Sequence, residues 1–282
     1  MIRFTVNSTA PALKKGSVAL DSEPDPQLAR DALPSTLKTT DVFLAAHPKQ
    51  PLLLELVAQG KAQYAFGFLE DDIEQLKDGD PKRAVLVERA TLLYESAFDA
   101  AMRRIALEES DFPASFKADM ATFEKELKGL DGDSGPGLYW AGLSLVSIIN
   151  LHRDDVDRVA ELPRAVALLE RAHQVAPAYF NHGAALALGV VYSSQAKAMG
   201  GKPELAKQMF DEVTRATGGK YLMAKVLFAR FYAVIQMDRD LFEKTLKEVL
   251  ATPANVWPEQ RLANELARRR AARYLKMAED LF

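Results

Sequence analysis

The chain has 282 residues, of which 48% are hydrophobic and 27% are charged, and this balance excludes an intrinsically disordered protein. It contains no cysteine, which excludes disulfides, cysteine-ligated zinc, iron–sulfur clusters and a thiol nucleophile. The formal net charge is −3, so we expect no nucleic-acid partner. Only four histidines are present, which leaves few candidates for histidine-based catalysis.

No segment is long and apolar enough to be a membrane span. The most apolar stretch, 138–151, has about 14 residues, whereas a spanning helix needs about 20. Residues 1–16 lack the apolar core of a signal peptide. From composition alone, the chain is either cytoplasmic or the mature form of an exported protein.

Helix-forming residues dominate the chain, and strand-like alternation and hairpin dipeptides are missing. Residues 1–24, which include Pro11, Gly16 and Pro24, predict an N-terminal arm or linker, and residues 25–282 predict one helical repeat domain. We expect helices at 26–46, 51–77, 81–109, 113–129, 136–151, 161–175, 179–198, 203–217, 220–236, 239–251 and 258–280.

Proline and glycine mark the breaks between these helices. Pro48 and Pro51 end one helix and start the next, because a residue before proline avoids the α region. Gly79 and Pro81 supply a stop and a start, and the strongest break is Gly129–Gly137. Because the connections are short, consecutive helices should pack as antiparallel hairpins.

A tetratricopeptide-like pattern is present in the second half of the chain. The second helix of a tetratricopeptide repeat has a small residue, a large apolar residue, another small residue and then a proline. In this chain the matching residues are Ala165, Leu169, Ala172 and Pro177. Its first helix carries Leu-Gly-x-x-Tyr, and the match is Leu188, Gly189 and Tyr192. The small residues would let two helices approach closely while the large one fills the groove.

The same pattern recurs further along the chain. Ala206 and Phe210 repeat the second-helix pattern 41 residues after Ala165, and Tyr232 repeats the first-helix tyrosine 40 residues after Tyr192. The tetratricopeptide period is about 34 residues, so the longer spacing implies insertions in the loops. The pattern predicts an all-α fold, an α-solenoid of antiparallel helical hairpins with a concave binding surface, and the alternative is a plain helical bundle.

The repeat register yields candidates for a ligand-binding groove. His182 begins a first helix and could contact a ligand, although capping or packing is the alternative role. Arg230 matches a groove-facing position and could meet an acidic ligand. Tyr192 and Tyr232 are expected in the core, where most aromatic residues at helical spacing lie. The candidates for the groove are Tyr139, Trp140, Asn150, His182, Ser193, Lys220 and Arg230.

No pattern indicates catalysis, a metal or a cofactor. The acidic loop Asp131–Gly135 fails as a calcium loop, because Pro136 and Gly142 replace the glycine and glutamate that such a loop requires. Asp154, Asp155 and Asp157 are typical of a helix start. The basic run Arg268–Arg273 is typical of a helix end, and we expect it to form a solvated or inter-subunit face. Histidine-glutamate zinc motifs, serine-nucleophile motifs and phosphate-binding loops do not occur.

The combined motifs resemble one family. They read Leu-Pro-Arg-Ala-Val-Ala-Leu-Leu-Glu-Arg-Ala from residue 162, Leu-Gly-Val-Val-Tyr-Ser-Ser from 188, Gly-Gly-Lys-Pro-Glu-Leu-Ala from 200 and Gly-Gly-Lys-Tyr-Leu-Met-Ala-Lys from 218. Arg30–Pro34 and Gln63–Phe66 agree in the first half. Over residues 26–276 the chain resembles the T component of tetratricopeptide-repeat-associated TRAP transporters, the TatT family.

This resemblance implies a periplasmic, all-α adaptor that associates with the solute-binding P component of a TRAP transporter. It also implies a homotrimer whose openings pass a small organic ligand, and a lipid anchor on an N-terminal cysteine. That cysteine is absent from this chain, and we expect the sequence to begin after it. The alternatives are a generic tetratricopeptide scaffold that binds a peptide in its groove and, far less favoured by the motifs, an enzyme.

Overall fold

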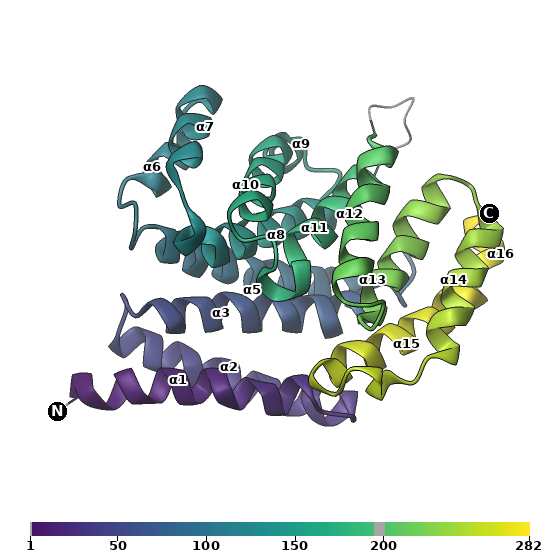
Figure 1. The fold of residues 1–282 in the computed structure, drawn as a ribbon, viewed down its shortest axis with the longest axis horizontal. Helices are drawn as coiled ribbons and strands as arrows, with labels where there is room; N and C mark the ends of the chain where they lie inside the picture. Colours follow the sequence, from purple (N-terminus) through teal and green to yellow (C-terminus); the bar gives the residue numbers. More distant parts are fainter. Residues whose placement is uncertain (1, 195–200) are drawn as a thin grey trace. The chain divides into compact units, whose positions relative to one another are not determined.

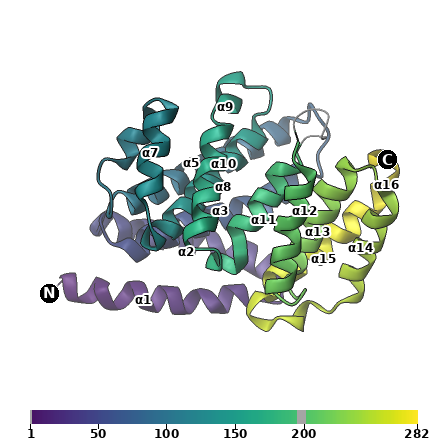
Figure 2. The same ribbon diagram turned by 45° about the horizontal axis from the view of Figure 1, so that its top comes forward.

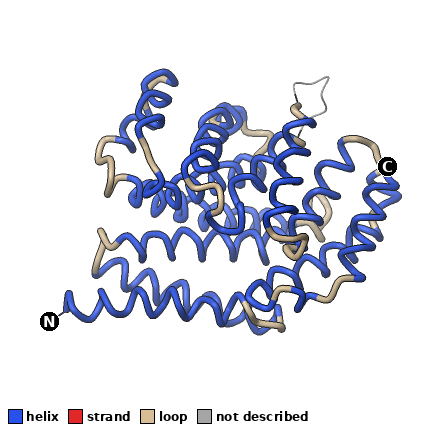
Figure 3. Tube along the Cα trace, in the orientation of Figure 1, coloured by secondary structure: helices blue, strands red, loops and turns tan. Residues whose placement is uncertain are grey.

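The computed structural model describes residues 2–194 and 201–282, and every regular element in these ranges is a helix (Figures 1 and 3). The predicted all-α class is therefore confirmed for the described part of the chain. The chain divides into two compact units. The first unit contains Met1–Gly16 and Arg30–Pro177, and the second contains Ser17–Ala29 and Ala178–Phe282.

The N-terminal segment is a helix rather than an irregular arm. Helix α1 (Ile2–Asp21) covers most of the stretch for which the sequence indicates no regular structure. Tertiary contacts explain the difference, because Ala10 is completely buried and Lys14 Nζ lies 2.9 Å from Glu55 Oε1. Such contacts override the weak local helix signals. The division into an arm and a single repeat domain stays a prediction.

The helices between α1 and Pro177 mostly follow the predicted order, and the first turn of α2 belongs to the second unit. They are α2 (Pro26–Ala46), α3 (Pro51–Tyr64), α4 (Glu70–Ile73), α5 (Pro81–Ile105), α6 (Phe112–Lys117), α7 (Met120–Gly129), α8 (Gly135–Leu151), α9 (Val156–Ala160) and α10 (Leu162–Val175). A π-helix, η1 (Ala65–Leu69), joins α3 to α4, and a short 3₁₀ turn, η2 (Gly132–Ser134), precedes α8.

The second unit is built in the same way. Its helices are α11 (Tyr179–Tyr192), α12 (Pro203–Ala216), α13 (Leu222–Leu227), the π-helix η4 (Phe228–Ala233), α14 (Arg239–Ala251), α15 (Arg261–Lys276) and α16 (Ala278–Leu281). The 3₁₀ turns η5 (Ala254–Val256) and η6 (Pro258–Gln260) lie between α14 and α15. The predicted end of the helix at 179–198 reaches residues outside the described ranges.

Four of the predicted helices that lie within the described ranges are interrupted. The one at 258–280 begins with the 3₁₀ turn η6 and is divided at Met277 into α15 and α16. The one at 51–77 contains the π-helix η1, and the one at 220–236 contains η4. The one at 113–129 breaks before Asp119, whose side chain accepts a hydrogen bond from the Thr122 amide at 3.0 Å and so caps α7. Hydrogen bonding to the charged form lowers the pKa of Asp119.

Helix α8 lies at the centre of the first unit and packs against α5 and α10 (Figures 1 and 2). Glycines permit the close approach. A Cβ added at Gly137 would lie 2.6 Å from Ile105 Cγ1 of α5, and one added at Gly142 would lie 2.7 Å from Leu169 Cγ of α10. Glycine is therefore required at both positions for α8 to pack this tightly.

The repeat-packing residues mostly occupy the cores of the units. Leu169 is completely buried in α10, and Phe210 of α12 packs on Gly189 of α11. Tyr232 is half-buried and stacks on Phe228 at a ring-centroid distance of 4.9 Å, while Pro177 is exposed in the turn after α10. The other buried members of the set are Ala165, Ala172, Leu188 and Ala206, and Tyr192 is half-buried.

Arg164 of α10 fastens α6 and α7 to the first unit. Its guanidinium carbon lies 5.8 Å from the ring centre of Phe116 and 5.4 Å from that of Phe123, and its Nη2 donates to the carbonyl of Ala118 at 2.6 Å. Arg171, two turns further on, donates through Nε to the carbonyl of Leu130 at 2.9 Å. One face of α10 thus holds both helices by cation–π and charged hydrogen bonds.

Replacing Arg164 by alanine should lower the free energy of unfolding by about 2 kcal/mol, because two cation–π contacts and a charged hydrogen bond are lost. Amide hydrogen exchange in α6 and α7 should accelerate more than in α8. Arg158→Ala is the control, since its exposed pair with Glu95 should contribute less than about 1 kcal/mol. Equal losses in the two variants, measured by urea denaturation, would contradict this role for Arg164.

Tyr221, which precedes α13, gives the second unit a predicted response to alkali. Its ring packs edge-on against Trp257 at 6.2 Å. Burial, with a smaller contribution from the charge of Asp21, raises the pKa of Tyr221 to about 12, whereas an unfolded tyrosine titrates near about 10. The associated stability is fully present below about pH 10 and is lost as the pH rises through about 12.

Comparing Tyr221→Phe with the unmodified chain tests this prediction. Phenylalanine cannot ionise, so the variant should lose less stability between pH 10 and 12 than the unmodified chain does. Thermal melts followed by circular dichroism at a series of pH values provide the measurement. Parallel pH profiles for the two proteins would show that Tyr221 titrates normally.

Candidate functional site

Arg230 is the candidate residue with the most distinctive surroundings. It lies in the π-helix η4, and its guanidinium carbon is 5.7 Å from the ring centres of both Phe231 and Tyr274. The residue is half-buried. Within the described ranges, Arg230 makes no hydrogen bond or ion pair. A guanidinium held by two aromatic faces, without an acidic partner, is suited to receiving an anion.

Helix α15 carries the basic run Arg268–Arg273. Arg273 also contacts Tyr274, with its guanidinium carbon 5.1 Å from the ring centre. Arg268 donates to the carbonyls of Leu250 and Thr252 and so caps the end of α14. Arg270 is only 2% exposed, so the expectation of a solvated face is wrong for this residue. The inter-subunit alternative stays untested.

The first turn of α11 has an unusual backbone. Phe180, Asn181 and His182 have φ angles of 49°, 55° and 61°, so three successive residues other than glycine adopt the left-handed conformation. Each costs roughly 1–2 kcal/mol relative to a right-handed turn. His182 Nδ1 lies 3.3 Å from Glu212 Oε1 of α12, an interaction that links this turn to the next helix. A role for His182 in packing is thereby supported, and ligand contact stays a prediction.

Three other candidates have local structural partners. Ser193 is buried and its hydroxyl donates to the Gly189 carbonyl at 2.8 Å. Asn150 is exposed and its side chain accepts a hydrogen bond from Arg153 Nε at 3.0 Å. Lys220 is exposed, and its carbonyl accepts a hydrogen bond from Asn264 Nδ2 at 3.0 Å. A ligand role for these residues stays a prediction.

Tyr139 and Trp140 lie in the core of the first unit rather than on an open surface. They are 5% and 1% exposed, and their ring centres are 4.6 Å apart. The reason is the position of α8, which is covered by α5 and α10. With Asn150, these two residues belong to the first unit, whereas His182, Ser193, Lys220 and Arg230 belong to the second.

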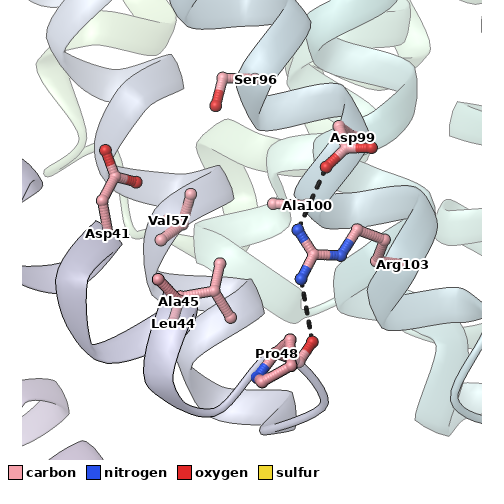
Figure 4. Close-up of a pocket in the computed structure, with 9 residues that line it drawn as sticks. All are labelled: Asp41, Leu44, Ala45, Pro48, Val57, Ser96, Asp99, Ala100 and Arg103. Atoms are coloured by element: carbon pink, nitrogen blue, oxygen red, sulfur yellow. Dashed lines mark hydrogen bonds and ion pairs between the residues drawn. The ribbon is translucent and has the colours of Figure 1, made fainter.

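A cavity that the sequence does not reveal lies in the first unit (Figure 4). It has a volume of about 220 Å³, and its walls come from α2, α3 and α5. Arg103 donates to Asp99 at 3.3 Å and to the Pro48 carbonyl at 2.9 Å. The lining residues are Asp41, Leu44, Ala45, Pro48, Val57, Ser96, Asp99, Ala100 and Arg103.

The polar groups of this cavity are largely satisfied by one another. The buried Lys61 places its Nζ 2.8 Å from both Asp41 Oδ1 and Ser96 Oγ, so it joins α2 and α5. Asp41 Oδ2 also lies 3.5 Å from Lys38 Nζ. This paired arrangement fits a structural role in holding three helices together better than it fits a binding site.

The described residues offer no sign of metal binding or of membrane crossing. Within 2–194 and 201–282, histidine, aspartate and glutamate side chains do not gather in threes that could hold a metal ion. In the same ranges, no helix has the length and apolar character needed to cross a bilayer.

Comparison with known families defines the class of this protein. The family described as TAtT, the TRAP transporter T-component, matches residues 22–282. The chain belongs to this family, and the resemblance inferred from its motifs is confirmed. It is therefore a component of a TRAP transport system.

A relative from Treponema pallidum (strain Nichols) matches almost the whole chain. This protein, described as an uncharacterized protein, is 24% identical over 263 residues. The matched region covers 92% of the present chain and 81% of the relative. The similarity thus extends over both units, but the relative's description adds no activity or partner.

Proposed function

We propose that this protein is a periplasmic adaptor that associates with the solute-binding P component of a TRAP uptake transporter. The observation that carries the proposal is the match of the T-component family to residues 22–282.

The proposed mechanism is docking and ligand transfer without bond chemistry. The solute-binding protein would deliver a small organic ligand into a groove or pore of the helical repeat. The buried repeat positions Ala165, Leu169 and Ala172 support the tetratricopeptide-like solenoid that this mechanism needs.

Analytical ultracentrifugation of the chain with the P component encoded beside it tests the association. A faster-sedimenting complex is expected, with or without the transported solute. A solute-binding protein from an unrelated transporter is the control and should sediment separately. If no complex with the neighbouring P component forms under either condition, the adaptor proposal is wrong.

We further propose a homotrimer and a lipid anchor on the full-length precursor. Light scattering tests the first part, since a monomer would return the chain mass of 31.2 kDa at micromolar concentration. Metabolic labelling of the precursor with a fatty acid tests the second. A generic peptide-binding scaffold is the alternative, and saturable binding on a peptide array without P-component association would favour it.

A further inference from the structure

We propose that the left-handed turn at 180–182 is a conformational switch at the start of α11. In the structure this turn is left-handed and is linked to α12 through His182 and Glu212. In the alternative state the same residues wind into a right-handed turn, which lengthens the regular part of α11 at its N-terminal end. The inference goes beyond the adaptor role and does not depend on it, since the turn and the helix that holds it lie in the second unit of this chain.

The residues in this turn are unusual for a left-handed conformation. Elsewhere in the described ranges, left-handed φ angles fall mainly on glycines, namely Gly79, Gly218 and Gly219 at 85°, 58° and 70°. Glycine has no Cβ to clash in this conformation, so it is suited to a turn that never changes. Met237 is the exception, and it is a single residue between η4 and α14. Three successive residues with side chains, by contrast, place the strain of a whole turn at one point.

The local sequence is compatible with a right-handed turn at the same place. Residues 178–182 contain neither glycine nor proline, so no residue in this stretch blocks a right-handed helix. Pro177 precedes them, and proline fits the first turn of a right-handed helix because no amide proton is needed there. In that form Tyr179, His182 and Leu186 would share one face of a continuous helix. Tertiary contacts, rather than the local sequence, therefore decide the handedness.

The link between the turn and α12 is weak. His182 Nδ1 lies 3.3 Å from Glu212 Oε1, which is at the long end of hydrogen-bond distances. The two side chains are 23% and 28% exposed, and a pair that solvent still reaches stabilises a structure only slightly. The rings of Tyr179 and Phe180 are 6.3 Å apart, also towards the long end of aromatic contacts. Small changes at the link can therefore shift the balance between a strained turn and an unstrained one.

Rewinding the turn would change the surface at the start of α11, the helix that packs against α12 (Figures 1 and 2). Phe180 and Asn181 are half-buried, and a change of handedness rotates each of them to another side of the helix. Proteins use rearrangements of this size, one helical turn, to expose or cover a surface. A molecule that binds one form better shifts the balance by the difference between its two affinities.

Isotope labelling of histidine alone makes the switch observable by nuclear magnetic resonance, because the chain has only four histidines. His182→Gln assigns the backbone amide resonance of His182, and the coupling between its amide and α protons reports the sign of φ. Exchange between the two turns appears as relaxation dispersion or as a second resonance. We expect exchange at His182 and none at His152, whose amide is hydrogen-bonded to the carbonyls of Ile148 and Ile149 at the end of α8.

Two substitutions of Asn181 should move the balance in opposite directions. Glycine tolerates the left-handed form at no steric cost, whereas alanine is the best former of right-handed helix. Asn181→Gly should lower the right-handed population by roughly 3-fold, and Asn181→Ala should raise it by roughly 10-fold. A turn that is strained but fixed would behave differently, because His182 would keep its left-handed φ in both variants and show no second state.

Glu212→Ala removes the link and should raise the right-handed population by roughly 2- to 5-fold. Asp211→Ala is the matched control, because Asp211 is the neighbouring residue on α12 and pairs with Lys207 of the same helix. Equal shifts in these two variants would contradict the role of the link. A single left-handed state of His182 in the unmodified chain, in Asn181→Ala and in Glu212→Ala would overturn the proposal. Should a variant not fold, the unmodified chain decides, since exchange at His182 supports the switch and its absence contradicts it.

Discussion

Replacement of Trp140 by alanine is expected to lower the free energy of unfolding by about 3–5 kcal/mol. Trp140 is 1% exposed in α8, the helix that packs against α5 and α10. Alanine would remove most of the buried side chain and leave a cavity that the surrounding helices can only partly close. Urea denaturation followed by circular dichroism measures the loss as a lower midpoint with an unchanged slope.

Leu92→Ala provides the control on a neighbouring helix. Leu92 of α5 is 59% exposed, so its truncation should change the unfolding free energy by no more than about 0.5 kcal/mol. Trp140→Phe should fall between the two, because most of the ring volume is kept. A near-neutral Trp140→Ala variant would show that the ring is not part of the core and would favour the groove position that the sequence indicates.

Helix starts with strong local signals could be predicted from the sequence. The helix predicted at 26–46 coincides with α2, Pro26–Ala46, and Pro51 and Pro81 begin α3 and α5 as expected. Proline at the first helical position acts through the chain's own geometry and so needs no knowledge of distant contacts. For the same reason, Asp119 is a sequence signal that could have located the break before α7. Aspartate is a preferred N-cap residue, and its side chain accepts a hydrogen bond from the Thr122 amide.

Features that depend on distant contacts could not be read in this way. Helix α1 is held through Ala10 and Lys14, and the partner of Lys14 is 41 residues away on α3. The π-helices η1 and η4 leave no mark in a hydrophobic pattern whose period cannot distinguish them from ordinary helix. Local propensity alone therefore misses both the first helix and the irregular turns.

The candidate site shows the same division. Repeat register selects Arg230 from the sequence, because the position follows from a pattern of neighbouring residues. Tyr274 is 44 residues further along the chain, and its contact with Arg230 is a tertiary one that the sequence does not reveal. The sequence also suggests a groove position for Trp140. The adjacent aromatic residues Tyr139 and Trp140 do not reveal which face of their helix will be covered by α5 and α10.

Replacement of Leu169 by alanine should destabilise the chain by about 2–5 kcal/mol, since the side chain is completely buried between α10 and α8. Gly142→Ala should also destabilise. The added Cβ would lie 2.7 Å from Leu169 Cγ and 3.1 Å from the Leu169 amide nitrogen. The clash costs about 1–3 kcal/mol and outweighs a gain of about 1 kcal/mol in helix propensity.

The double variant distinguishes close packing from two independent losses. Removing most of the Leu169 side chain makes room for a methyl group at position 142, and that methyl group partly fills the new cavity. Gly142→Ala with Leu169→Ala should therefore be more stable than the sum of the single losses predicts, by about 0.5–3 kcal/mol. Urea denaturation of all four proteins gives this coupling energy.

Gly129→Ala is the matched control for the cycle. A Cβ at Gly129, the last residue of α7, would meet nothing within 4 Å, so alanine there should be neutral or stabilising by about 0.5 kcal/mol. Combined with Leu169→Ala, it should give additive effects, because the two sites share no close contact. If the losses for Gly142→Ala and Leu169→Ala are also additive, the two side chains do not compete for the same space. Helices α8 and α10 would then lie further apart than the distance of 2.7 Å between the added Cβ and Leu169 Cγ implies. The small and large residues of the repeat pattern would then not form the interlocking contact on which a solenoid of paired helices depends.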